Sequence, residues 1–247
     1  MTIVEEIFSR ARLAGKRIIL AEGGDQRIAD AAVEAHNQNI ARITILGDVG
    51  VVSEQVRSAG GDPDSINIID PATSPKRKDY ARRLYELRKA KGLTEEQAYE
   101  LAGGNLYYPV LALSAGDADG LVSGATHSTS DTVRPALQVL KTAPGYSIVS
   151  SCFIMVLPDQ SYGEKGVLIF ADCGLVIDPS PEELADIACA AAASFRQFVG
   201  DDPRIAMLSF STKGSAKHEK ADKVIQATEL VRLRRPDLIV DGELQAD

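Results

Sequence analysis

Two short loops rich in hydroxyl-bearing residues hold the side chains best suited to chemistry. The first loop, SGATHSTSD at residues 123–131, directly follows an apolar run that ends at Val122. The next helix is expected to start at about residues 131–134, because Pro135 fits a helix only in its first turn. A strand, a small polar loop and a helix N-terminus together collect anions, because backbone N–H groups and hydroxyls converge there.

Arg134 supports an anion at this loop. It falls in the first turn of the expected helix, where the helix dipole disfavours a cation unless an anion lies between the two. That anion is either a ligand or the loop's own Asp131, with the hydroxyls then acting only as helix caps. The ligand hypothesis assigns anion binding to Ser123, Gly124, Ser128, Thr129, Ser130 and Arg134.

The second loop, SFSTKGS at residues 209–215, repeats this pattern after an apolar run that ends at Leu208. Lys213 lies beside a glycine and several hydroxyls and is a candidate phosphate ligand, although the loop lacks the GxxxxGK[ST] pattern of a P-loop. Two such loops, each at the carboxyl end of a strand, strengthen the prediction, because open α/β sheets bind their ligands there.

A basic segment, Lys76–Lys91, contains eight Lys or Arg residues and two acids. Most of these charges are expected on a solvated helix face. Arg88 differs, because helical spacing puts it among Ala81, Leu84 and Leu87 on the apolar face. An inward guanidinium needs an anionic or carbonyl partner, which is either a carboxylate of the fold or a ligand phosphate.

The remaining polar residues are less specific. Acids near strand ends are potential proton carriers or metal ligands but most often form turns, and here they are Glu22, Asp25, Asp172, Asp178, Asp241 and Glu243. The three histidines form no cluster, so no metal site is predicted, and only His127 lies in a candidate loop. Cys152 and Cys189 are interpreted as core residues, as is Cys173, although it follows a strand.

Short β-branched runs alternate with amphipathic stretches along the chain, which is typical of parallel sheets covered by helices on both faces. Capping boxes at Thr94–Gln97 and Ser180–Glu183 mark two helix starts. The extended run 147–157, a turn-rich loop and the strand at 167–170 predict an antiparallel hairpin inside a mixed sheet. A turn at residues 142–145 suggests two α/β domains, residues 1–144 and 145–247.

Composition narrows the class of protein. The 27 Lys and Arg residues against 35 Asp and Glu residues give a net charge of −8, which argues against a nucleic-acid partner. No apolar run is long enough to cross a membrane, and no signal peptide is visible. Three cysteines without a CxxC pair fit a reducing compartment. We therefore expect a soluble cytoplasmic protein that binds an anionic, phosphate-bearing ligand.

The same motifs resemble the phosphate acetyl/butyryl transferase family, and the acetyl-specific members in particular. The resemblance runs along the whole chain and rests on YELRK at 85–89, DGLVSG at 119–124, DTVRP at 131–135, AMLSFSTKGSAK at 206–217 and DGELQ at 241–245. It implies a two-domain, three-layer α/β/α fold with mostly parallel sheets, similar to isocitrate dehydrogenase, and a homodimer. It further implies reversible transfer of acetyl between CoA and phosphate in an interdomain cleft, with CoA as substrate and neither a metal nor another cofactor.

Within the resemblance, Arg88 and Arg134 match family arginines, expected to bind the phosphoryl oxygens of phosphate or acetyl phosphate. Direct attack is the expected route, and a covalent route through Cys173 is the rival. The family continues beyond the DGELQ motif with a Ser-Arg-Gly segment and an Asp base, so the catalytic residues are expected beyond Asp247 and the chain is expected to be truncated, which leaves open whether it is active alone. Two alternatives stay open: a butyryl-type acyltransferase, and a CoA- and phosphate-binding module without catalysis.

Overall fold

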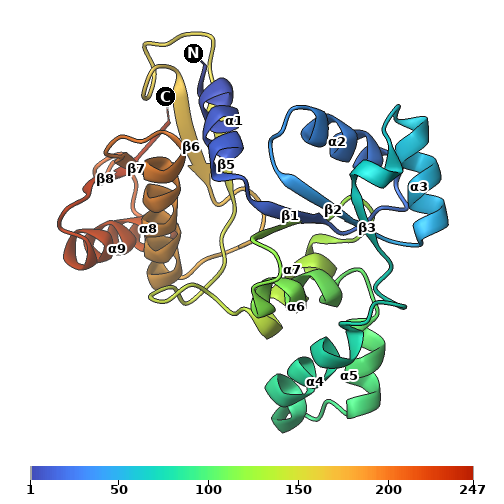
Figure 1. Cartoon of the computed structure of the whole chain (residues 1–247). Helices are drawn as coiled ribbons and strands as arrows, with labels where there is room; N and C mark the ends of the chain where they lie inside the picture. Colours follow the sequence, from blue (N-terminus) through green and yellow to red (C-terminus); the bar gives the residue numbers. More distant parts are fainter. Residues whose placement is uncertain (1, 247) are drawn as a thin grey trace. The chain divides into compact units, whose positions relative to one another are not determined.

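The computed structural model describes residues 2–246 and divides them into two compact units. One unit is Val4–Lys141, and the other comprises residues from Thr142 onward together with residues 2–3. Figure 1 shows helices and strands alternating along both. The α/β class with mostly parallel strands is thereby confirmed, whereas the domain limits at residues 144 and 145 stay a prediction. None of the helices in residues 2–246 combines the length and apolar character needed to cross a bilayer.

A four-stranded parallel sheet organises the first unit. Its strands are β1 (Arg17–Leu20), β2 (Arg42–Leu46), β3 (Asn67–Ile69) and β4 (Gly120–Val122), in the order β3-β2-β1-β4. All four strands fall in apolar or β-branched runs of the sequence, as predicted. Because successive side chains of a strand point to opposite faces, each strand supplies apolar groups to both sides of the sheet.

Helices cover both faces of this sheet (Figure 1). On one face, α2 (Gln26–Asn37) and α3 (Val49–Ser58) pack on Leu20 and Ile45. On the other face, α4 (Arg77–Arg88), α5 (Glu95–Ala102), α6 (Tyr107–Ala115) and α7 (Thr129–Val139) build a core around Ile19 and Leu46. The remaining helical segments of this unit are α1 (Ile3–Ala14), η1 (Pro63–Ser65) and η2 (Lys89–Lys91). The carboxyl ends of β1 and β4 therefore lie side by side and point their loops to one edge.

The second unit contains two separate two-stranded sheets. Antiparallel β5 (Cys152–Val156) and β6 (Val167–Ala171) form the predicted hairpin, and parallel β7 (Arg204–Leu208) and β8 (Ile239–Leu244) pack against α8 (Pro181–Phe198) and α9 (Glu219–Arg234). The prediction of a mixed sheet was wrong for the described residues, because the hairpin pairs only with itself.

The strand expected at residues 147–157 is shorter than predicted because two carboxylates take its first backbone donors. Asp186 accepts the N–H and the hydroxyl of Ser147, and Asp172 accepts the N–H and the hydroxyl of Ser151. A strand cannot extend through backbone groups that are already bonded elsewhere. Pairing therefore begins only at Cys152.

Helix starts were predicted correctly in two places and wrongly in one. Both capping boxes, at Thr94 and Ser180, are present. Helix α7, however, begins at Thr129 and has Pro135 in its interior. The helix starts early because the Ser128 hydroxyl accepts the N–H of Asp131, an N-cap that the proline-based argument did not weigh. Arg134 consequently lies in the second turn of α7 rather than the first.

Candidate anion-binding site

A buried carboxylate organises the loop between β4 and α7. Glu22 follows β1, is only 3% exposed, and accepts the backbone N–H groups of four consecutive residues at 2.7–3.1 Å. The four donors are Gly124, Ala125, Thr126 and His127. The backbone donors expected to bind a ligand in this part of the loop are therefore already occupied by the protein's own anion.

These contacts keep Glu22 ionised. Burial of the carboxyl group opposes ionisation, but hydrogen bonds from His127, from the backbone and from the Thr126 hydroxyl outweigh it and lower the pKa of Glu22 to about 2. Nδ1 of His127 lies 2.6 Å from Oε1 of Glu22. Gly23 sits directly beside this carboxylate, and a Cβ there would lie 2.4 Å from a methyl group of Ile45. The turn after β1 therefore requires glycine at position 23 if the Glu22 carboxylate is to reach the loop.

The start of α7 keeps free donors. Within residues 2–246, the N–H groups of Thr129 and Ser130 have no acceptor, as expected for the first positions of a helix. The hydroxyl of Ser128 is already engaged with Asp131 and Ser130, at 2.7 and 2.9 Å. Of the two predicted roles, helix capping is therefore present for Ser128, and anion binding remains available at the two N–H groups.

Two hydroxyl oxygens beside this loop are buried without any hydrogen-bond partner. They belong to Ser123, which was predicted, and to Thr132, which was missed. A Cβ built on Gly124 would meet Thr132 Oγ1 at 3.9 Å, so the loop glycine and this hydroxyl face each other. Buried hydroxyls without partners are costly and mark places where a ligand supplies the missing bond. The signal for Thr132 was its position one helical turn after Ser128.

Two cations approach the same part of the first unit. Arg88 ends α4, is half-buried, and has no hydrogen-bonding or ionic partner for its guanidinium among the described residues. Arg134 has only a 3.5 Å ion pair with Asp131 and is mostly exposed. Both act on Tyr107: burial raises the pKa of that phenol, and the charges of Arg134 and Arg88 oppose the rise. Tyr107, which the sequence did not single out, is thus a residue on which the charges of both arginines act.

The second loop is organised in the same way, by Glu243 of β8. This carboxylate is 3% exposed and accepts the N–H of Gly214 at 2.6 Å and the hydroxyl of Ser211 at 3.0 Å. Lys213 is paired with Asp241 and also donates to the carbonyl of Gly242. Its ammonium group is therefore already neutralised, and Lys213 lies in the other unit from Arg88 and Arg134.

A third acidic residue, Asp172, shapes the turn that contains Cys173. It accepts the N–H groups of Gly174 and Leu175, each at 2.7 Å, and burial of the carboxyl is outweighed by such bonds, so that the pKa of Asp172 falls to about 2. The Cys173 thiol donates to the carbonyl of Phe170 at 2.9 Å. Glu22, Asp172 and Glu243 are therefore loop-forming carboxylates, which was the commonest of the interpretations open for them.

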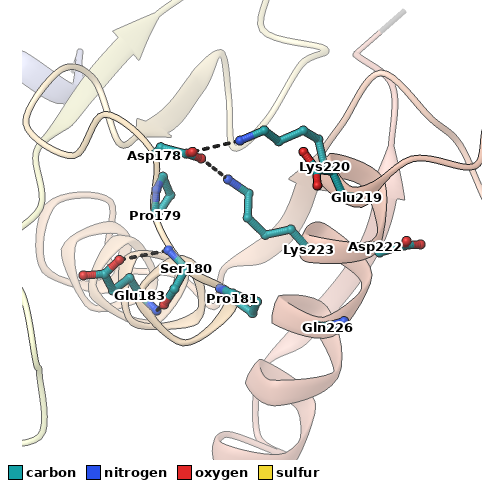
Figure 2. Close-up of a pocket in the computed structure, with 10 residues that line it drawn as sticks. All are labelled: Asp178, Pro179, Ser180, Pro181, Glu183, Glu219, Lys220, Asp222, Lys223 and Gln226. Atoms are coloured by element: carbon teal, nitrogen blue, oxygen red, sulfur yellow. Dashed lines mark hydrogen bonds and ion pairs between the residues drawn. The ribbon is translucent and has the colours of Figure 1, made fainter.

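Figure 2 shows a surface hollow of about 590 Å³ in the second unit, between the N-terminal ends of α8 and α9. Its two lysines, Lys220 and Lys223, both pair with Asp178. Three further acids line it, namely Glu183, Glu219 and Asp222. With four acids against two lysines, this hollow does not favour an anion, and it contains none of the residues predicted to bind one.

Fold and site together define an α/β protein with a candidate anion site at the carboxyl edge of a parallel sheet. Comparison with known proteins specifies it further. The family model described as "Phosphate acetyl/butaryl transferase" matches residues 2–247. The phosphate acetyltransferase of Clostridium acetobutylicum is 46% identical over the whole chain, which spans 74% of that relative. The chain therefore belongs to the phosphate acetyl/butyryl transferase family.

Solved structures similar to this chain support the same family. A phosphotransacetylase from Streptococcus pyogenes superposes with a TM-score of 0.92 at 38% identity, covering 100% of this chain and 74% of the other. The EutD phosphotransacetylase from Staphylococcus aureus gives a TM-score of 0.87, also at 38% identity, and covers 98% of this chain and 72% of that one. The predicted family and fold class are thus confirmed.

Proposed function

We propose that the chain binds inorganic phosphate, and the phosphoryl group of acetyl phosphate, between the start of α7 and the end of α4. Arg88 and Arg134 supply the positive charge, and the hydroxyls of Ser123 and Thr132 supply the short-range hydrogen bonds. The observation that carries the proposal is the unpartnered state of Arg88 and of both hydroxyls. Two positive charges and two hydroxyl donors suit a tetrahedral dianion, which accepts several charge-assisted hydrogen bonds at once.

The proposed reaction is reversible transfer of an acetyl group between CoA and phosphate. An oxygen of bound phosphate attacks the carbonyl carbon of acetyl-CoA, the carbon–sulfur bond breaks, and acetyl phosphate and CoA result. Arginine pairs favour this step because they hold the phosphate in place and stabilise charge that develops next to it. CoA enters as a substrate, and the proposal needs no other cofactor and no metal.

Acetyl is the acyl group we favour. Relatives named phosphate acetyltransferase share 46% identity with the chain in both Clostridium acetobutylicum and Acetivibrio thermocellus. A homodimer in the cytoplasm is part of the proposal, as the resemblance to the family implies. Thr129 and Ser130 complete the proposed phosphate site through their free N–H groups, beside Gly124 and the Ser128 cap. Lys213 receives no phosphate contact, because Asp241 neutralises it.

The experiment is thioester formation from acetyl phosphate and CoA, followed by ultraviolet absorbance on the purified chain. The expected result is accumulation of acetyl-CoA, with the rate lowered at least about tenfold by Arg134→Ala, the loss of one charge-assisted contact. The control is Arg82→Ala, because Arg82 is exposed on α4 and, among residues 2–246, pairs only with Asp79. Tight binding of CoA and phosphate without turnover would instead identify a binding module.

A further inference from the structure

Tyr107 lies on the helix that packs against both arginine-bearing helices of the first unit. It is the first residue of α6, and α6 contacts α4, which ends in Arg88, and α7, which carries Arg134. The Tyr107 ring is half-buried against the core that contains Leu84. Leu84 precedes Arg88 by one helical turn on the same face of α4. Tyr107 therefore shares a core with the helix face to which Arg88 belongs.

One hydrogen bond joins Tyr107 to α7. The phenol hydroxyl donates to Oε1 of Gln138 at 2.8 Å. Gln138 follows Arg134 by four residues, so the two side chains project from the same face of the helix. Within residues 2–246 the side chain of Gln138 makes no other hydrogen bond. The contact with Tyr107 therefore ties the Arg134 face of α7 to α6.

A tie from a neighbouring helix matters here because of Pro135. Proline has no N–H, so residue 135 cannot donate to the carbonyl of Asp131, and α7 lacks one internal hydrogen bond beside Arg134. The 3.5 Å ion pair between Arg134 and Asp131 adds little constraint, since both side chains are largely exposed. The bond from Tyr107 to Gln138 offsets the missing one from outside the helix.

The electrostatics of Tyr107 fit such a role. Burial raises the pKa of the phenol, while the charges of Arg134 and Arg88 oppose the rise, so the hydroxyl stays neutral near neutral pH. With its proton on Gln138, the phenol oxygen presents lone pairs, which suit guanidiniums because these groups only donate hydrogen bonds. A carboxylate in this position would neutralise the arginines. A neutral phenol leaves their charge to a bound anion.

We propose that Tyr107 is a positioning residue of the phosphate site: through Gln138 it holds the face of α7 from which Arg134 projects, so that the guanidinium is in place before phosphate binds. The inference rests on the proposed phosphate site and adds to it a residue that does not itself touch the ligand. A guanidinium that is already in place loses less conformational freedom on binding, and the affinity for phosphate is higher for that reason.

The first test is calorimetric titration of Tyr107→Phe with inorganic phosphate. Phenylalanine keeps the ring and its packing and removes only the hydroxyl, so the fold is expected to persist. Phosphate affinity should fall about three- to tenfold, the effect of one lost hydrogen bond. Tyr85→Phe is the matched control, because Tyr85 packs on the same core and its hydroxyl has no hydrogen-bond partner within residues 2–246. Wild-type affinity in Tyr107→Phe would overturn the inference and leave the proposed function intact.

Double-mutant cycles separate positioning from a general effect on the fold. In Arg134→Ala the positioned group is absent, so adding Tyr107→Phe should change phosphate affinity by less than about twofold. Gln138→Leu should weaken binding as much as Tyr107→Phe does, and the two changes together should weaken it no more than either alone. A loss from Tyr107→Phe that keeps its full size in the Arg134→Ala chain would contradict the inference. Absence of phosphate binding to the wild-type chain would instead defeat the proposed function, and this inference with it.

Discussion

Glu22 and Gly124 are 102 residues apart in sequence, and a 2.7 Å hydrogen bond joins the carboxylate of the first to the backbone N–H of the second. The bond links the ends of two neighbouring strands, β1 and β4, at the edge where the proposed ligand binds. The Glu22 carboxylate thereby occupies backbone N–H groups of the loop that we expected a ligand to use. We therefore expect phosphate to bind to the arginines, the unpartnered hydroxyls and the first turn of α7.

The first prediction concerns Thr132, whose buried hydroxyl has no partner. Replacement by valine keeps the shape and removes the unsatisfied oxygen, so the Thr132→Val variant should be more stable than wild type by up to about 1 kcal/mol. The same change should weaken phosphate binding about tenfold, because one of the ligand's hydrogen bonds is lost. Urea unfolding and calorimetry measure the two effects. Lower stability together with unchanged phosphate affinity would show that Thr132 serves the fold alone.

The second prediction concerns acid stability. The pKa of Glu22 is lowered to about 2 in the folded protein, from 4.5 ordinarily. Folding therefore favours the ionised group, and this contribution is fully present above pH 4.5 and is lost as the pH falls through about 2. It amounts to roughly 3 kcal/mol. The free energy of unfolding should depend less steeply on pH between 5 and 3 in Glu22→Gln than in wild type. Glu54→Gln, on the exposed face of α3, is the control, and equal slopes in Glu22→Gln and wild type would refute the assignment.

The third prediction uses two adjacent glycines in the turn that carries Glu22. A Cβ on Gly23 would lie 2.6 Å from the carbonyl oxygen of Leu46, whereas a Cβ on Gly24 meets nothing within 4 Å. Gly23→Ala should therefore destabilise the fold by about 1–3 kcal/mol, since the backbone must shift. Gly24→Ala should change stability by less than about 0.5 kcal/mol. Thermal unfolding of both variants tests the difference, and similar melting temperatures would show that the turn is not tightly packed.

The fourth prediction concerns Lys213, the one candidate ligand in the second unit. Because its ammonium group pairs with Asp241, and both side chains are about half exposed, Lys213→Met should lower stability by no more than about 1 kcal/mol. Its affinity for inorganic phosphate should match wild type within about twofold. Calorimetry decides this point. A tenfold loss of affinity would show that Lys213 binds phosphate even though Asp241 pairs with it.

Local sequence features predicted much of this structure. The strand at Arg17–Leu20 and the two capping boxes follow from spacing and residue type within a few turns of chain. Long-range contacts were not predictable in this way. The capture of the loop donors by Glu22 and the influence of the Arg88 and Arg134 charges on Tyr107 depend on which strands and helices become neighbours. The start of α7 was predicted wrongly from Pro135, because the N-cap at Ser128 outweighs the preference of proline for the first turn of a helix.

Calorimetric titration with inorganic phosphate tests the central claim most directly. The wild-type chain and the Arg82→Ala control should bind phosphate with equal affinity. Arg88→Ala and Arg134→Ala should each weaken binding by about ten- to one-hundred-fold, because each removes a charge-assisted contact worth about 1.5–3 kcal/mol. Wild-type affinity in both arginine variants would contradict the account and place the phosphate site elsewhere in the chain.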